Sequence, residues 1–154
     1  MEPTQGIMYT VDIQEVPPVH RTRHKTILKD VRALDAADVD NRPVNLIFLD
    51  AHLVEPQMAM FDRLDEAGLI SDAIVLAFHD THLWPYPAAD WAVKTPEGFM
   101  HRSAERDMVT IFKQRGWDAF MLHPTFGAMK AGGLAFRHGM VVMQRYRELK
   151  TSWE

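Results

Sequence analysis

The pattern of apolar and polar positions predicts two neighbouring β-strands that both end in polar residues. One apolar run of strand length covers Asn45–Leu49, and a second covers Asp72–Phe78. Runs of this kind are typical of strands buried in a parallel sheet. Because ligands of open α/β sheets lie beyond the carboxyl ends of the strands, we expect the polar residues that follow the two runs to converge on one crevice. They are Asp50, His52, His79, Asp80 and His82.

The segment between the two runs changes to helical spacing. Met58, Phe61 and Leu64 recur at intervals of a helical face, and Gly68 suits a left-handed cap. A helix over Glu55–Ala67 is therefore expected, with Pro56 in its first turn. A strand, helix, strand order with short connections is the crossover unit of a parallel sheet.

The remaining elements extend this α/β pattern. We expect strands at Ile7–Ile13, Lys25–Leu28 and Trp117–Leu122, and a helix over Ser103–Arg115. Two short runs near the end, Leu134–Arg137 and Met140–Gln144, flank His138-Gly139 and predict a hairpin, so one edge of the sheet should be antiparallel.

The stretch Thr81–Met100 has three prolines and four large aromatic residues, which is too irregular for a strand and too interrupted for a long helix. Long ordered loops are often functional, so it suggests a lid or substrate loop. The alternative is that its aromatic side chains only pin a long loop to the core.

Composition narrows the class of protein. A chain of 154 residues that is 47% hydrophobic suits a single domain with a genuine core. The net charge of -4, without any block of like charges, predicts a small-molecule or protein partner and no nucleic acid or membrane surface. The absence of cysteine, of a membrane-length apolar run and of a signal peptide fits a cytoplasmic protein.

With this order of elements, the chain resembles a class I, S-adenosylmethionine-dependent methyltransferase of the small-molecule O-methyltransferase kind. Four segments carry the resemblance, and they look like the second to fifth strands of that family with their polar ends: Tyr9–Ile13, Lys29-Asp30, Leu46–His52 and Ile74–Thr81. Gly132–Phe136 and Met140–Arg145 resemble its closing antiparallel strands. The resemblance covers nearly the whole chain, and its specificity lies in the order of the segments rather than in any one motif.

The resemblance implies a Rossmann-like, three-layer, mostly parallel sheet with an antiparallel C-terminal edge hairpin. It also implies a departure, because the family opens with a strand and a glycine-rich turn, whereas only Gly6 precedes Gly68 here. We therefore expect an N-terminally incomplete domain that binds the cofactor weakly or not at all on its own, and that forms a homo-oligomer or has its sheet completed by a partner chain.

The resemblance also assigns roles to acidic residues. Asp12 would accept the ribose hydroxyls of S-adenosylmethionine, Asp30 the adenine amino group, and Asp50 would lie at the cofactor as well. For Asp12 and Asp30 the alternative is an ordinary solvated acid at a strand end. Asp50 and Asp80 match the positions at which metal-dependent relatives hold Mg²⁺, which prefers oxygen ligands.

Histidines beside these carboxylates leave the mechanism open. They favour either a softer divalent metal or a metal-free mechanism in which His52, His79 or His82 takes the proton of an acceptor hydroxyl. The catalytic candidates are thus Asp50, His52, His79 and Asp80. Two other functions stay possible: a non-catalytic methyltransferase-like subunit that binds a partner chain, and a metal-dependent hydrolase built on the same cluster.

Overall fold

The computed structural model describes residues 6–19, 22–79, 81, 92–95, 98–101, 104–122 and 139–145. The chain divides into two compact units. The first unit consists of Met1–Pro43 and Pro56–Leu69, and the second of Val44–Glu55 and Ile70–Glu154. No helix among the described residues is long and apolar enough to cross a membrane.

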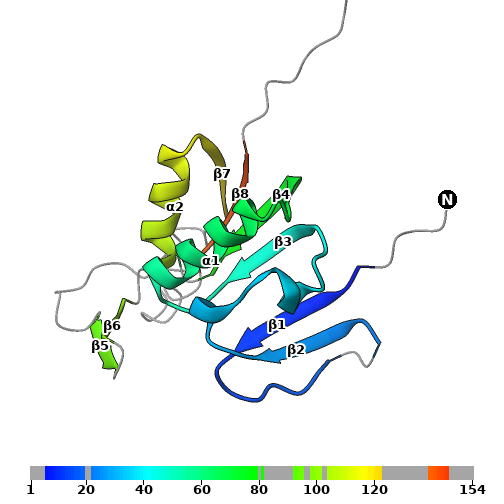
Figure 1. Cartoon of the computed structure of the whole chain (residues 1–154). Coiled ribbons are helices and arrows are strands. Elements are labelled where there is room, and N and C mark those ends of the chain that lie inside the picture. Colours follow the sequence, from blue (N-terminus) through cyan, green and yellow to red (C-terminus); the bar gives the residue numbers. More distant parts are fainter. Residues whose placement is uncertain are drawn as a thin grey trace, which may run out of the picture. The chain divides into compact units, whose positions relative to one another are not determined.

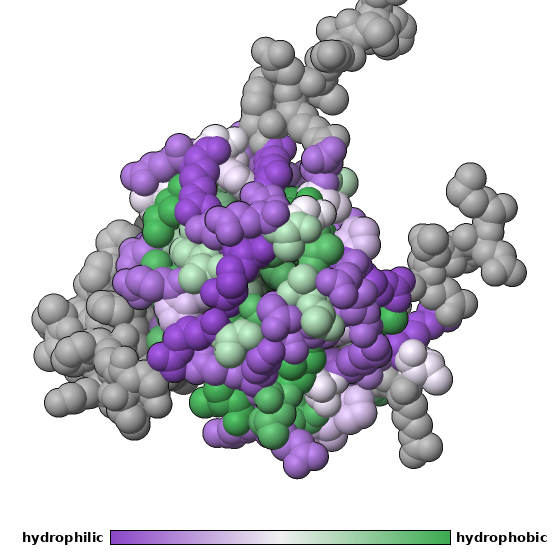
Figure 2. Space-filling view, in the orientation of Figure 1, coloured by the Kyte–Doolittle hydropathy of each residue, from purple (hydrophilic) through white to green (hydrophobic). Residues whose placement is uncertain are grey.

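The first unit is built on a pair of parallel strands. β1 (Met8–Asp12) pairs with β2 (His24–Leu28) in parallel, as the sequence predicts, and Figure 1 shows them side by side. Two short 3-10 helices follow, η1 (Val31–Ala33) and η2 (Ala36–Val39). Figure 2 shows polar side chains over much of the displayed face, with apolar ones reaching the surface between them.

The helix α1 (Val54–Glu66) confirms the predicted helix between the two apolar runs. Its buried side chains include Met58, Phe61 and Leu64, as the helical spacing indicates. Arg63 fastens α1 to η1, because its guanidinium donates to the carbonyls of Val31 and Leu34 at 3.1 Å each. Gly68 follows at a φ of 70°, a conformation that favours glycine.

The second unit holds a four-stranded sheet with the order β3-β4-β8-β7. β3 (Val44–Leu49) and β4 (Ile70–Phe78) are parallel, which confirms the central pairing predicted from the sequence. β8 (Met140–Arg145) is antiparallel to both β4 and β7 (Trp117–Leu122). The sheet is therefore mixed, and a mostly parallel, three-layer arrangement is not confirmed.

The predicted terminal hairpin also differs from the structure. Met140–Gln144 is a strand, but the strands that it pairs with are β4 and β7. Leu134–Arg137, its expected partner, lies outside the described residues. Pairing to β7 is favoured because the two strands match over six consecutive residue pairs, from Trp117↔Arg145 to Leu122↔Met140.

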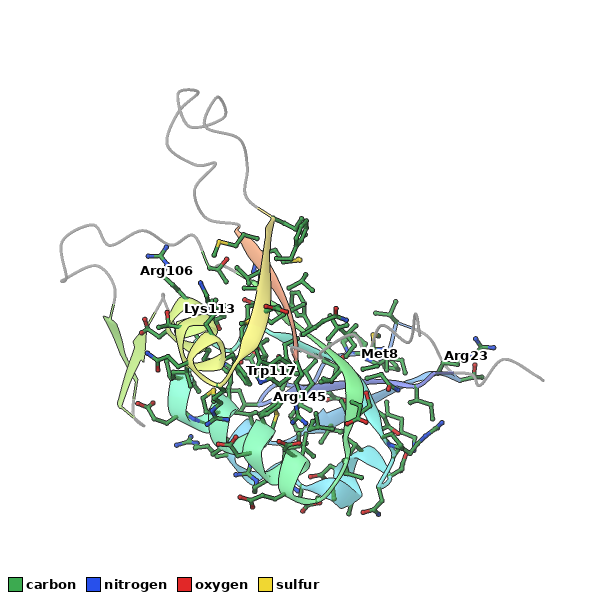
Figure 3. All side chains as sticks on the ribbon, turned by 90° about the horizontal axis from the view of Figure 1, so that it is seen from above. Met8, Arg23, Arg106, Lys113, Trp117 and Arg145 are labelled. Carbon is green, nitrogen blue, oxygen red and sulfur yellow. The ribbon has the colours of Figure 1, made fainter. Side chains whose placement is uncertain are left out.

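The core of this unit lies under α2 (Ala104–Gln114), which Figure 1 shows beside β7. Phe112 of α2 has its ring centroid 5.8 Å from that of Phe78 and 5.0 Å from that of Trp117. The buried residues of β4 and β8 on this side include Leu76 and Met143, both with no exposed surface. Figure 3 shows Trp117 next to Arg145, whose guanidinium carbon lies 5.4 Å from the indole ring centroid.

The other face of the same sheet carries exposed apolar side chains. Leu46 and Phe48 of β3 are 61% and 54% exposed, and Phe120 of β7 is 68% exposed. The apolar run of β3 predicted a buried strand, and this was wrong for Leu46 and Phe48. Within the described part of this unit, the one α-helix that packs on the sheet, α2, covers the opposite side.

A short hairpin lies in the stretch for which a loop without strands was expected. β5 (Ala92–Thr95) and β6 (Gly98–His101) pair antiparallel, with Thr95 opposite Gly98. The prediction failed because it judged the stretch by its prolines. Two four-residue segments can still pair when only two residues connect them. Most of the remaining proposed lid lies outside the described residues.

Candidate functional site

The carboxyl ends of β3 and β4 bring Asp50 and His79 together, as the sequence predicts. The main-chain N–H of His79 donates to the carbonyl of Leu49 at 3.1 Å, which continues the parallel pairing by one residue. Nδ1 of His79 lies 3.2 Å from Oδ1 of Asp50. The Asp50 carboxylate is exposed, so it can accept this hydrogen bond and still face solvent or a ligand.

His52 turns away from the strand direction immediately after β3. Its φ is 53°, in the left-handed region that residues other than glycine adopt at a cost of roughly 1–3 kcal/mol. Its main-chain N–H donates to Oε1 of Glu105 at 2.8 Å, and its ring Nδ1 lies 3.0 Å from Oε2 of the same carboxylate. A buried side chain of α2 thus holds His52 in this conformation.

Together these residues form an alternating series of acids and imidazoles, which we call the 50–105 cluster: His79, Asp50, His52 and Glu105. Nε2 of His52 lies 3.8 Å from Oδ1 of Asp50, which joins the two hydrogen-bonded pairs. Exposure decreases inward from Asp50, because the Asp50 side chain is 43% exposed, that of His52 25%, and that of Glu105 0%. His79, on the other side of Asp50, is 28% exposed. The cluster therefore runs from the surface into the core.

Sequence reasoning missed Glu105. The available signal was its position on the apolar stripe of α2, since Glu105 lies three and four residues before Met108 and Val109, both buried. A carboxylate almost never becomes fully buried unless it is paired. An acid on the apolar face of a predicted helix therefore indicates a buried partner.

Arg106, the next residue of α2, ties the helix to the end of β4. Its Nε donates to the carbonyl of Thr81 at 2.9 Å, while the Thr81 N–H donates to the carbonyl of Gly139. Burial lowers the pKa of the Arg106 guanidinium from its usual value. The Thr81 hydroxyl is buried, and within the described residues it has no hydrogen-bond partner.

The predicted metal site gains no support. Asp80 and His82 lie outside the described residues. Among the residues that are described, no group of three or more His, Asp or Glu side chains could hold a metal ion.

The other two predicted cofactor residues, Asp12 and Asp30, belong to the first unit. Asp12 ends β1 and accepts a hydrogen bond from the Gln14 N–H at Oδ1, 2.9 Å away. Asp30 caps η1, and Arg32 donates to both of its oxygens. The Arg32 side chain is the main cause that lowers the pKa of Asp30. The roles of both acids at a cofactor stay predictions.

No protein-family model matches the chain, and the comparison with curated proteins finds no match. Among solved structures, the chain is similar to an rRNA methylase from Streptococcus thermophilus. The two are 13% identical with a TM-score of 0.49, over 92% of this chain and 74% of the other. Values this low do not assign a substrate to the chain.

The name of that protein nevertheless contradicts one prediction. The sequence led us to expect a small-molecule substrate and no nucleic acid, whereas the similar structure belongs to a protein named for rRNA. The net charge of a whole chain does not describe the local positive patches that contact phosphates, so the charge of -4 does not exclude a nucleic acid.

Proposed function

We propose that the protein transfers a methyl group from S-adenosylmethionine to an oxygen or nitrogen nucleophile, with the 50–105 cluster at the reacting end. The observation that carries this proposal is the contact between Asp50 and His79 at the ends of β3 and β4. These are the two strands whose sequences resemble adjacent strands of class I methyltransferases. Their parallel pairing agrees with that resemblance.

The closing strands give a second line of support. The segment Met140–Arg145 resembles an antiparallel closing strand of the family, and β8 is antiparallel to β4. The resemblance predicted parallel strands followed by antiparallel closing strands, and the parallel pair β3 and β4 followed by the antiparallel strand β8 agrees with that expectation.

The acids of the first unit fit the cofactor unequally. Asp12 is exposed, and the single hydrogen bond described for its carboxylate uses Oδ1, so Oδ2 can accept a ribose hydroxyl. Asp30 fits an adenine amino group less well, because Arg32 occupies both of its oxygens. When bound, S-adenosylmethionine supplies a methyl group activated by its positive sulfur.

The residues of the cluster supply what a nucleophile needs. A hydroxyl or amine must lose a proton as it is methylated, and an imidazole takes protons near neutral pH. His52 and His79 both contact carboxylates, which orient their rings and stabilise the cations that form. A positioned base of this kind accelerates a reaction by roughly 10²–10⁴-fold.

Metal-dependent chemistry is not needed for this proposal. A methyl group that is already activated requires deprotonation of its acceptor, and the cluster provides two imidazoles for that step. The metal-dependent hydrolase has no supporting group of ligands within the part of the chain that the structure describes.

Calorimetric titration of the full-length protein with S-adenosylmethionine tests the proposal. We expect one site, and we expect Asp12→Asn to weaken it by roughly 10–100-fold, because hydrogen bonds to charged groups contribute about 1.5–3 kcal/mol. Asp118→Asn, at an exposed acid of β7, is the matched control and should leave the affinity unchanged.

Two results would contradict the proposal. One is the absence of any heat of binding up to millimolar cofactor, which would show that S-adenosylmethionine is not the methyl donor. The other is equal weakening by Asp12→Asn and Asp118→Asn, which would show a general effect of charge instead of a specific contact with the ribose.

A further inference from the structure

The carboxylate of Glu105 is the most deeply buried charged group among the described residues, and both of its oxygens are used by one residue. Oε1 accepts the main-chain N–H of His52 at 2.8 Å, and Oε2 lies 3.0 Å from Nδ1 of the same residue. Glu105 has no exposed surface. We propose that Glu105 is a positioning residue that fixes the His52 ring in the tautomer that carries its proton on Nδ1.

The main-chain hydrogen bond sets the position of His52. The N–H that Glu105 accepts belongs to a residue with a left-handed φ of 53°. This conformation is unfavourable for histidine, so it needs a compensating contact. Because Glu105 lies in the first turn of α2, its main chain is held by a helix that packs on the sheet through Phe112. The anchor of His52 is therefore rigid.

The contact between the His52 ring and Glu105 determines which ring nitrogen carries the proton. A main-chain N–H can only donate, so Oε1 must be an acceptor. Oε2 then faces Nδ1, and one proton lies between the two atoms. Imidazole is a stronger base than a carboxylate, so this proton belongs on Nδ1. Free histidine in water does not have this constraint.

The consequence concerns the other ring nitrogen. With Nδ1 as the donor to Glu105, a neutral His52 has an unprotonated Nε2, which lies 3.8 Å from Oδ1 of Asp50 toward the exposed end of the cluster. Nε2 is then the atom that takes the acceptor's proton. This last step rests on the proposed function, whereas the tautomer does not.

The substitution Glu105→Gln separates position from tautomer. Glutamine has nearly the same shape, but it offers one oxygen and one NH₂ group. If its oxygen accepts the His52 N–H, its NH₂ must donate to Nδ1, and the ring proton has to move to Nε2. The variant therefore keeps both contacts and reverses the tautomer. The same logic applies to serine proteases, in which amidation of the orienting carboxylate leaves the geometry intact and produces the wrong tautomer.

Nitrogen-15 NMR of the imidazole rings measures the tautomer directly in the full-length protein, with the His52 signals identified by their loss in His52→Ala. We expect a proton on Nδ1 in the wild type and on Nε2 in Glu105→Gln. Asp107→Asn, at an exposed acid of the same helical turn, is the matched control and should keep the wild-type tautomer.

The proposal is overturned if wild-type His52 carries its proton on Nε2, a measurement that needs no variant to fold. It is also overturned if a folded Glu105→Gln keeps the wild-type tautomer. Circular dichroism and the melting temperature establish that the variant is folded.

A second measurement connects the tautomer to function. If the protein binds S-adenosylmethionine, Glu105→Gln should retain that affinity in the calorimeter while methyl transfer to any acceptor falls at least about 100-fold. Failure of the wild type to bind the cofactor would refute the proposed function and leave the tautomer assignment standing. A changed tautomer with undiminished transfer would refute the role of Nε2 as the base.

Discussion

Truncation of Phe112 should separate α2 from the sheet. Phe112 is fully buried, and its ring lies between those of Phe78 and Trp117 with centroid distances of 5.8 and 5.0 Å. Phe→Ala changes in cores cost roughly 3–5 kcal/mol, because both the transfer energy and a cavity contribute. The two ring contacts favour the upper half of that range, since an aromatic pair contributes about 0.5–1.5 kcal/mol beyond its area.

This cost is large against the roughly 5–15 kcal/mol that keeps a domain folded. For a chain of this size it corresponds to a melting temperature lower by roughly 6–20 °C. Urea unfolding followed by circular dichroism measures the free energy of unfolding, with Phe120→Ala as the control, because Phe120 is 68% exposed. The control should stay within roughly 0.5 kcal/mol of the wild type. A loss below about 1 kcal/mol in Phe112→Ala would refute the view that these rings anchor α2.

Two further predictions concern the first unit. His24 is buried, its Nδ1 accepts the Val19 N–H at 2.7 Å, and its Nε2 contacts the Thr10 hydroxyl at 2.8 Å. His24→Ala should therefore lower the free energy of unfolding, measured in urea, by about 1–3 kcal/mol. A change below about 0.5 kcal/mol would contradict the importance of these contacts. Hydrogen bonds from Lys25 and, to a smaller extent, from Tyr9 lower the pKa of Asp40 in the folded protein. On acidification the unfolded chain therefore takes up this proton first. The stability that the Asp40 contacts contribute is lost as the pH falls through about 4 toward the pKa of the folded state. Asp40→Asn keeps a residue that tolerates the left-handed φ of 54° and should make the decline of the melting temperature between pH 5 and 3 shallower, whereas an unchanged slope would contradict the ion pair's role.

Local patterns in the sequence correctly predicted those elements that form because of the spacing of neighbouring residues. The helical spacing of Met58, Phe61 and Leu64 predicted the position of α1. Gly68 and Gly116, which come after the two helices, both have a positive φ. The polar residues after the two strongest apolar runs also placed Asp50 and His79 correctly at adjacent strand ends.

Features that depend on distant packing were not predictable in this way. Glu105 meets His52 across 53 residues of sequence, and no spacing rule links the two. The exposure of Leu46 and Phe48 likewise depends on what covers a sheet face, whereas an apolar run indicates only which residues prefer burial. The pairing of β8 with β4 depends on long-range register, which hairpin patterns do not specify.

If the 50–105 cluster lies at the proposed site of methyl transfer, bound S-adenosylmethionine should change the surroundings of its two imidazoles. The most direct test is an imidazole nitrogen-15 NMR titration of the full-length protein with S-adenosylmethionine, with signals assigned by single substitution of each histidine. We expect the ring signals of His52 and His79 to shift along a saturable binding curve for one site as the cofactor is added. The signals of His24, which pairs with Met8 at the opposite end of β1 from Asp12, should stay in place. Saturable binding that leaves His52 and His79 unchanged, or no binding at all, would contradict the claim.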